Sequence, residues 1–152
     1  MMKPRVVPDT NLFIGARFNP RSSSARILDL CLKGSFRAIL STKVKAEVRS
    51  MLGRVGCEGE FRSKVRRLLK EAEEVEVREE LPLLMEDPDD NKLLNCALWG
   101  KADYLITNDR HLLKFGEYLG VKIRRPSEFL KEWGQAKKGA GSSQPLKRTE
   151  GK

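Results

Sequence analysis

Short apolar runs alternate along the chain with longer segments whose apolar residues recur every three or four positions. The short runs are typical of buried strands, and the longer segments are typical of helices with one apolar face. We predict strands near residues 6–8, 36–40, 75–77, 104–107 and 121–124. We predict helices over residues 11–18, 22–33, 43–52, 60–74, 90–100, 108–115 and 126–133. Because every connection between strands is too long for a hairpin, the pattern favours an α/β fold with a parallel sheet.

The helical and strand patterns cover most of the chain and then stop. The chain has 152 residues, which suits one domain with a single core. Beyond Trp133 the sequence loses its periodicity and is rich in Gly, Ser, Lys and Gln. We therefore expect a folded domain over residues 1–133 and a basic, disordered tail over residues 134–152.

Composition excludes several classes of protein. No run approaches the roughly 18 apolar residues needed to span a bilayer, and Pro8 and Asp9 interrupt the start of the chain before a signal peptide could form. We expect a cytoplasmic protein without a membrane partner. The three cysteines include no C-x-x-C pair, so we interpret them as free thiols and not as a disulfide framework or a zinc site: Cys31, Cys57 and Cys96.

The formal charge is +9 at neutral pH, with a pI near 9.7. A basic protein with acids in a cleft suits a polyanionic substrate, although a basic balance alone is weak evidence. Part of the charge lies on one face of the helix predicted over residues 60–74, and we interpret that face as simply solvated. Its members are Arg62, Lys64, Arg66, Arg67 and Lys70.

The first predicted strand ends at an acid. Val6 and Val7 lead to Asp9, and a second apolar run begins at Leu12. An acid at the carboxyl end of a buried parallel strand can line a functional cleft. The same acid can instead accept a hydrogen bond from the first turn of the next helix, as an N-cap. The strand alone does not separate these two roles for Asp9.

Helix periodicity predicts that two more acids lie near the same edge of the sheet. In the third predicted helix, Glu47 lies about 40° around the axis from Met51, at the margin of the apolar stripe. That position fits either a salt bridge at the rim of the core or a cleft. Apolar residues follow Asp90 at i+3, i+4, i+7 and i+8, so Asp90 begins an apolar stripe and Asp89 suits the N-cap. Because helices begin where parallel strands end, Asp90 would share an edge with Asp9.

A later strand repeats the design of the first. It ends at Thr107, two residues before Asp109, whereas Asp103 precedes it and would lie at the opposite edge. Carboxylates gathered at one edge repel one another unless a cation or raised pKa values relieve the repulsion. Hard oxygen ligands without a partnering Cys or His favour Mg²⁺ or Mn²⁺ over zinc. We interpret His111 as a surface residue of the short helix.

Taken together, four segments of the chain resemble the PIN domain family. They are Val-Pro-Asp-Thr-Asn at 7–11, Ser-Thr-Lys-Val-Lys-Ala-Glu-Val at 41–48, Asp-Pro-Asp-Asp-Asn-Lys-Leu-Leu at 87–94 and Ala-Asp-Tyr-Leu-Ile-Thr-Asn-Asp at 102–109. The resemblance covers about residues 3–133. More narrowly, the chain is similar to VapC-like ribonucleases, the PIN proteins identified as toxin components of toxin–antitoxin systems.

The resemblance implies a three-layer α/β/α, Rossmann-like domain with a central, mainly parallel sheet of about five strands. It also implies a metal-dependent ribonuclease whose catalytic, metal-binding quartet matches Asp9, Glu47, Asp90 and Asp109, supported by Asn11 and Thr107. One or two Mg²⁺ or Mn²⁺ ions would activate water for hydrolysis of single-stranded or looped RNA. A cognate antitoxin and a homodimer are the protein partners implied. Basic residues near the acids in sequence are weaker candidates to hold RNA phosphates: Arg17, Arg21, Arg26, Lys43 and Lys92.

Other functions are compatible with parts of the pattern. Haloacid-dehalogenase-like phosphatases use Asp-x-Asp after the first strand, but Asn11 takes the place of the second acid. A receiver domain would need an acidic pair and a lysine after the last strand, whereas Lys122 falls inside that strand. A housekeeping RNA-processing nuclease would carry the same acids as a toxin. A non-catalytic RNA-binding module could use them only to hold Mg²⁺.

Overall fold

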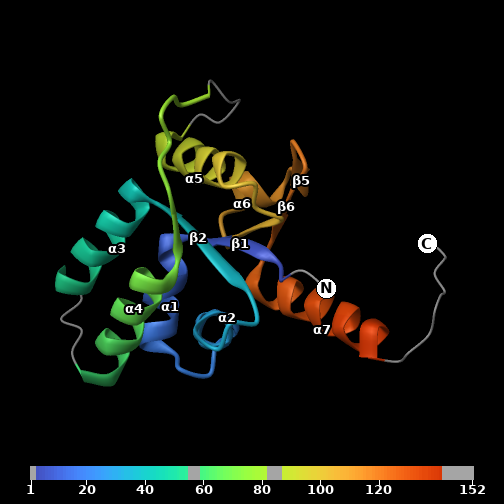
Figure 1. The fold of residues 1–152 in the computed structure, drawn as a ribbon, viewed down its shortest axis with the longest axis horizontal. Coiled ribbons are helices and arrows are strands. Elements are labelled where there is room, and N and C mark those ends of the chain that lie inside the picture. Colours follow the sequence, from blue (N-terminus) through green and yellow to red (C-terminus); the bar gives the residue numbers. More distant parts are fainter. Residues whose placement is uncertain (1–2, 55–58, 82–86, 142–152) are drawn as a thin grey trace.

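The computed structural model describes residues 3–54, 59–81 and 87–141. Its elements follow the predicted alternation of strands and helices (Figure 1). In chain order they are β1 (Arg5–Pro8), α1 (Thr10–Phe18), α2 (Ser23–Leu32), β2 (Arg37–Ser41), α3 (Thr42–Arg54), α4 (Gly59–Glu71), β3 (Glu73–Val75), α5 (Pro88–Trp99), β4 (Tyr104–Ile106), α6 (Arg110–Leu113), β5 (Glu117–Tyr118), β6 (Val121–Arg124) and α7 (Pro126–Gly141).

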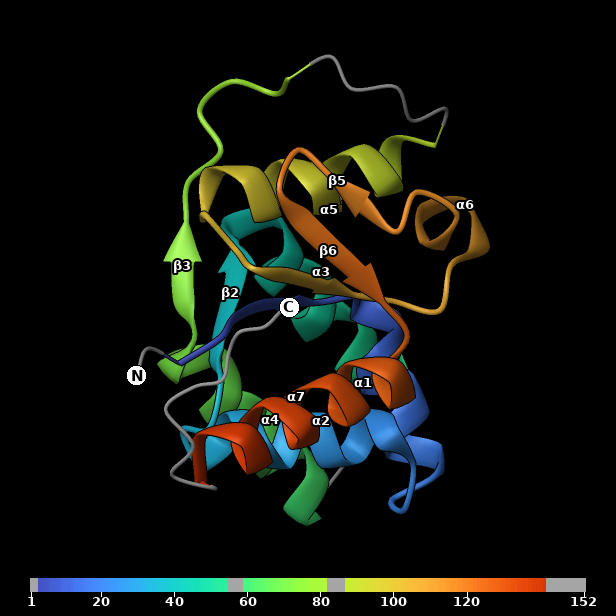
Figure 2. The ribbon, with the colours of Figure 1, turned by 90° about the vertical axis from the view of Figure 1, so that its right-hand side faces the viewer.

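The sheet has six strands in the order β3-β2-β1-β4-β6-β5. Strands β1, β2, β3, β4 and β6 run parallel, and β5 pairs antiparallel with β6. Figure 2 shows the sheet between α5 and α6 on one side and α1, α2 and α7 on the other. The three-layer α/β/α fold with a mainly parallel sheet is therefore as predicted, with one strand more than expected.

Alternation along the central strands builds one core on each face of the sheet. Val6 packs with Ile106 and with Phe129 of α7, whereas Val7 packs with Leu105 and with residues of α5 on the other face. These four strand residues are fully buried. Parallel strands covered on both faces need such continuous apolar runs, which is why the sequence shows short runs and not simple alternation.

Several predicted boundaries are wrong. The strand expected at residues 75–77 lies at Glu73–Val75, and the N-cap of α5 is Asp87, not Asp89. Helix α7 continues to Gly141, so the chain does not leave the helix at Trp133 as expected. The rest of the predicted tail, residues 142–152, lies outside the described residues.

The sequence pattern also missed a hairpin. Strands β5 and β6 are joined by Leu119 and Gly120, whose φ angles are 49° and 88°. A two-residue turn with positive φ at both positions matches the twist of paired strands. Leucine is an unusual residue there, which is why the turn escaped a prediction based on turn-forming residues.

Among the thiols, Cys31 and Cys96 are free, as expected, and Cys57 lies outside the described residues. No helix in the described part of the chain is both long and apolar enough to cross a membrane.

The end of α5 packs unusually closely against the sheet. A Cβ atom added at Gly100 would lie 2.5 Å from Cγ2 of Ile39 and 3.0 Å from the carbonyl oxygen of Cys96. The carbonyl oxygen of Gly100 also accepts a 2.6 Å hydrogen bond from the guanidinium of Arg5 in β1. Gly100 is therefore needed for the close approach of α5 to β1 and β2.

We expect Gly100→Ala to lower the free energy of unfolding by about 1–3 kcal/mol, because the added methyl group overpacks a rigid contact. Denaturant unfolding measures this loss. Gly53→Ala is the matched control, since a Cβ there meets no atom within 4 Å and lies in a helix. The control should be neutral or stabilising by up to about 1 kcal/mol. Equal stabilities of the two variants would contradict the close approach at Gly100.

Candidate active site

Asp9 follows β1, from which the sheet extends in both directions, through β2 and β3 on one side and through β4 and β6 on the other. Strand β1 is bordered by β2 on one side and β4 on the other, and the following helices lie on opposite faces of the sheet. The crevice at the carboxyl ends of such strands is where open α/β sheets bind ligands. The N–H of Asp9 donates to the carbonyl oxygen of Ile106 at 2.9 Å, which joins the ends of β1 and β4.

Both oxygens of Asp9 are held. Oδ1 accepts the N–H of Asn11 at 3.1 Å, so Asp9 is the N-cap of α1, and Oδ2 accepts the hydroxyl of Thr107 at 2.7 Å. The side chain is largely buried and also lines a cleft. Capping and exposure to a cleft, which were alternatives in the sequence, therefore coexist.

The pKa of Asp9 is raised, first because of burial and further because of the charges of Asp109 and Glu47. The hydrogen bonds from Thr107 and Asn11 oppose this shift. The environment thus disfavours a bare carboxylate at Asp9 and would favour one neutralised by a cation.

Thr107 connects the acids after the two central strands. It is fully buried, and its hydroxyl oxygen accepts the N–H of Asp109 at 3.0 Å while donating to Asp9. Asp109 caps α6 by accepting the N–H of His111 at 2.8 Å. A single hydroxyl group therefore positions one carboxylate and the backbone of another.

Asp90 and Asp109 form a close carboxyl pair. Asp90 lies in the first turn of α5 and is 3% exposed. Burial raises its pKa to about 7, and the hydrogen bond to Asp109 and the charge of Asp109 add to the shift. For Asp109, burial acts to raise the pKa, but hydrogen bonds from the His111 N–H and from Asp90 outweigh it, so the pKa is lowered. Without a cation, Asp90 is therefore mostly protonated below about pH 7 and can then donate a hydrogen bond to Asp109.

Glu47 faces this pair from α3 and is bound by a lysine. Lys92 of α5 contacts Glu47 Oε2 directly and lies 3.4 Å from Asp89. Burial acts to lower the pKa of Lys92, but the hydrogen bond and charge of Glu47 outweigh it and the pKa is raised. Lys92 therefore remains protonated and offsets part of the negative charge.

The cleft between α3, α5 and the ends of β1 and β4 has a volume of about 370 Å³. It brings together all four acids of the predicted quartet and Asn11, with Thr107 beneath Asp9. Among the described residues, six acids line it against two cations, so its field is strongly negative. The lining residues are Asp9, Thr10, Asn11, Glu47, Ser50, Arg54, Asp87, Asp89, Asp90, Lys92, Leu93 and Asp109.

Of the five basic residues predicted to hold RNA, Lys92 alone lines this cleft. Arg17 lies beside Phe18, Lys43 pairs with Glu80 at 3.0 Å, and Arg21 and Arg26 are exposed. Ser50 and Arg54 were missed, although they follow Glu47 at i+3 and i+7 and so share its helix face.

The donor set fits a hard divalent cation. One oxygen of Asp90, one of Asp109 and a ring nitrogen of His111 lie within 4.8 Å of one another. Carboxylate oxygens dominate the surroundings, as Mg²⁺ and Mn²⁺ require. His111 also lies 3.2 Å from Asp109 through Nδ1, so this exposed side chain is closer to the acids than its sequence position suggested.

We expect Asp90→Asn to stabilise the protein in EDTA at about pH 8 but not at about pH 5. In the folded state the pKa of Asp90 is about 7, against 3.8 for the ordinary group. The protonated carboxyl group therefore supports the fold at low pH, and that support is lost as pH rises through the folded pKa. Asparagine removes the buried charge and can still donate to Asp109.

Denaturant titrations at both pH values measure this difference. Asp29→Asn is the control, because Asp29 pairs with Lys64 on α4 outside the cleft. If the difference in stability between Asp90→Asn and wild type is the same at both pH values, the raised pKa of Asp90 is contradicted.

Known proteins share this fold. A protein of Methanocaldococcus jannaschii, itself uncharacterized, is 28% identical over 152 residues, covering 87% of this chain and 93% of that protein. The chain is similar to the structure of VapBC2 from Rickettsia felis bound to a DNA fragment from their promoter, with a TM-score of 0.56 and 18% identity. That likeness covers 80% of this chain and 98% of the other.

The PIN domain of T. brucei RRP44 is similar over 92% of this chain and 87% of its own length, with a TM-score of 0.52 and 14% identity. The family model described as the PIN domain matches residues 5–111, a span that contains β1 and the acids at 9, 47, 90 and 109. The chain therefore belongs to the PIN domain family, a family of nuclease folds.

Proposed function

We propose that this protein is a ribonuclease that hydrolyses RNA phosphodiester bonds with Mg²⁺ or Mn²⁺. The observation that carries the proposal is the convergence of Asp9, Glu47, Asp90 and Asp109 on one cleft at the switch point of the sheet. The pKa values of Asp9 and Asp90 are raised by burial and by neighbouring acids, and that of Asp109 is lowered by hydrogen bonds. Acids with shifted pKa values that line a cleft are common at functional sites.

Each acid has a distinct place in the proposed mechanism. Asp9 and Asp109 would hold the ion directly, because Thr107 positions both of them. Glu47 and Asp90 would ligate it or orient the attacking water. A bound Mg²⁺ or Mn²⁺ supplies a Lewis acid that lowers the pKa of water and offsets charge on the phosphate. Lys92 holds Glu47 in the cleft through their ion pair and would offset part of the charge of a bound phosphate.

The phosphotransfer alternatives remain weaker. The N–H of Asn11 is bonded to Asp9, and its exposed side chain offers an amide where a phosphatase would need a second acid. Lys122 lies in β6, beside the ring of Tyr104 at 5.7 Å, and does not line the cleft.

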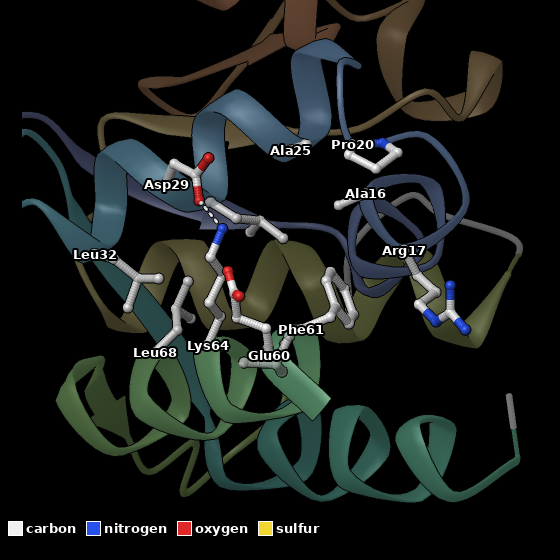
Figure 3. A pocket seen from close by; sticks show the side chains of 12 residues that line it. Ala16, Arg17, Pro20, Ala25, Asp29, Leu32, Glu60, Phe61, Lys64 and Leu68 are labelled. Atoms are coloured by element: carbon white, nitrogen blue, oxygen red, sulfur yellow. Dashed lines mark hydrogen bonds and ion pairs between the residues drawn. The ribbon is translucent and has the colours of Figure 1, made fainter. Parts of the chain in front are cut away.

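A cognate antitoxin protein is the partner that we propose. An apolar groove of about 350 Å³ lies between α1, α2 and α4, where Phe61 and Leu68 face Ala16 and Ala25 (Figure 3). The ion pair between Asp29 and Lys64 at 3.2 Å joins its walls. Such a groove suits an apolar peptide segment, and the similarity to VapBC2 agrees with a toxin that has a protein partner. A cytoplasmic homodimer remains the expectation from sequence.

Housekeeping RNA processing is the second candidate function. The acidic cleft would serve either role.

We expect Asp9→Asn to lower the rate of RNA cleavage by more than about 100-fold. Changes to residues that only support metal ligands typically cost roughly 10–100-fold, and a direct ligand should matter more. The wild-type protein should cleave labelled single-stranded RNA in Mg²⁺ or Mn²⁺ and not in EDTA. Asp29→Asn, which changes the same chemical group outside the cleft, should keep its activity. Wild-type RNA binding without cleavage in either metal would instead favour a non-catalytic module, and full activity in folded Asp9→Asn would rule out the mechanism.

Expression in a bacterial host separates the toxin role from housekeeping. We expect the wild-type chain to arrest growth and Asp9→Asn to allow it, because arrest depends on RNA cleavage. Co-expression of a short reading frame adjacent to the gene should restore growth. An active ribonuclease that leaves growth unchanged would favour the housekeeping role.

A further inference from the structure

A second groove, between α3 and α4, carries the opposite charge to the acidic cleft. Figure 1 shows the two helices as neighbours, on the far side of the molecule from α7. The groove has a volume of about 380 Å³. Among the described residues, its lining consists of five cations and two leucines, without an acid: Lys45, Arg49, Leu52, Arg62, Arg66, Leu69 and Lys70.

Helix α3 separates this groove from the acidic cleft. One flank of the helix presents Glu47, Ser50 and Arg54 to the cleft, and the other presents Lys45 and Arg49 to the groove. An α-helix with its side chains is only about 10–12 Å across. A short chain of phosphates that occupies the cleft can therefore reach over α3 into the groove.

The cations of α4 divide into two sets. Lys64 pairs with Asp29 at 3.2 Å and Arg67 lies 3.9 Å from Glu71, so acids partly neutralise both. Arg62, Arg66 and Lys70 follow one another at four-residue intervals and face the groove. Within the described part of the chain, neither Arg66 nor Lys70 makes an ion pair. The basic face interpreted from sequence as solvated is therefore not uniform.

One cation of the groove is buried and already has partners. Lys45 is 5% exposed, and its ammonium group donates to the carbonyl oxygen of Ala72 at 3.2 Å and lies 3.4 Å from Glu74. Glu74 therefore partly neutralises Lys45, as Asp29 does Lys64. The groove depends more on its arginines, whose planar guanidinium groups bind phosphate through two hydrogen bonds.

We propose that the α3–α4 groove binds the phosphodiester backbone of a single-stranded nucleic acid. The charge, the concavity and the two-helix lining match a run of phosphates, which gains affinity from each cation that it contacts. That the same strand also enters the acidic cleft rests on the proposed nuclease function; binding in the groove does not. None of these five cations is among the residues that the sequence suggested for RNA binding.

The test compares two charge-matched variants of the full chain on the same helix. Arg66→Gln with Lys70→Gln removes two groove cations, and Lys64→Gln with Arg67→Gln removes two cations outside the groove. Fluorescence anisotropy measures binding of a labelled oligouridine and of the matching oligodeoxyuridine in EDTA, which prevents metal-dependent cleavage. Thermal melts confirm that both variants fold.

We expect the groove variant to bind both oligonucleotides about 10-fold more weakly, with a salt dependence smaller by about 1–1.5 in log–log slope. The control variant should change affinity less than about 2-fold. Equal losses in both variants would overturn the proposal, since they would show a general charge effect. A loss for RNA alone would overturn the assignment to the phosphate backbone.

Two further measurements keep the groove separate from catalysis and from a protein partner. Asp9→Asn should lose cleavage without losing oligonucleotide affinity, so failure of the nuclease proposal leaves the groove assignment intact. A polyglutamate peptide should bind wild type and the groove variant equally. If it binds wild type and not the groove variant, while oligonucleotides bind both equally, the groove is a site for an acidic protein and the proposal is wrong.

Discussion

Hydrogen bonding between the ends of β1 and β4 is the constraint on which the site depends. The N–H of Asp9 bonds to Ile106, and the Thr107 hydroxyl connects Asp9 to the backbone of Asp109. Because Thr107 is fully buried, water cannot compete for its hydroxyl, and the proton goes to the carboxylate. Two segments separated by 98 residues are thereby held in one geometry. Glu47 of α3 and Asp90 of α5 then line the cleft at this edge of the sheet.

The same constraint gathers charges that destabilise one another. The pKa of Asp90 is raised to about 7, and Glu47 is paired with Lys92. Asp9 accepts two hydrogen bonds that only partly oppose its raised pKa. A divalent cation would relieve all of these contacts at once, so binding of an ion and stability of the fold are linked. Such local destabilisation is typical of sites maintained for function.

Local patterns explain which parts could be predicted from sequence. The phase of α5 placed Asp90 toward the core edge, and the strand ends at Asp9 and Asp109 placed those acids beside it. Glu47 was left between a salt bridge and a cleft, and it takes part in both. Periodicity states which face of an element is apolar, but not which neighbouring side chain meets a given polar residue. The pairing of Lys92 with Glu47 and the capping by Asp87 depend on such contacts and were not foreseen.

The charges of α3 and α4 show the same limit more sharply. The sequence of α4 reveals a basic helix, but only packing against α3 distinguishes Arg66 and Lys70 from Lys64 and Arg67. Separation of the two charge types also has a physical reason. Further cations inside the acidic cleft would pair with its carboxylates, as Lys92 does with Glu47, and would compete with a metal ion for them. On the opposite flank of α3, the cations of the groove lie apart from those acids. A single helix can thus hold a site for cations and a site for anions about one helix diameter apart.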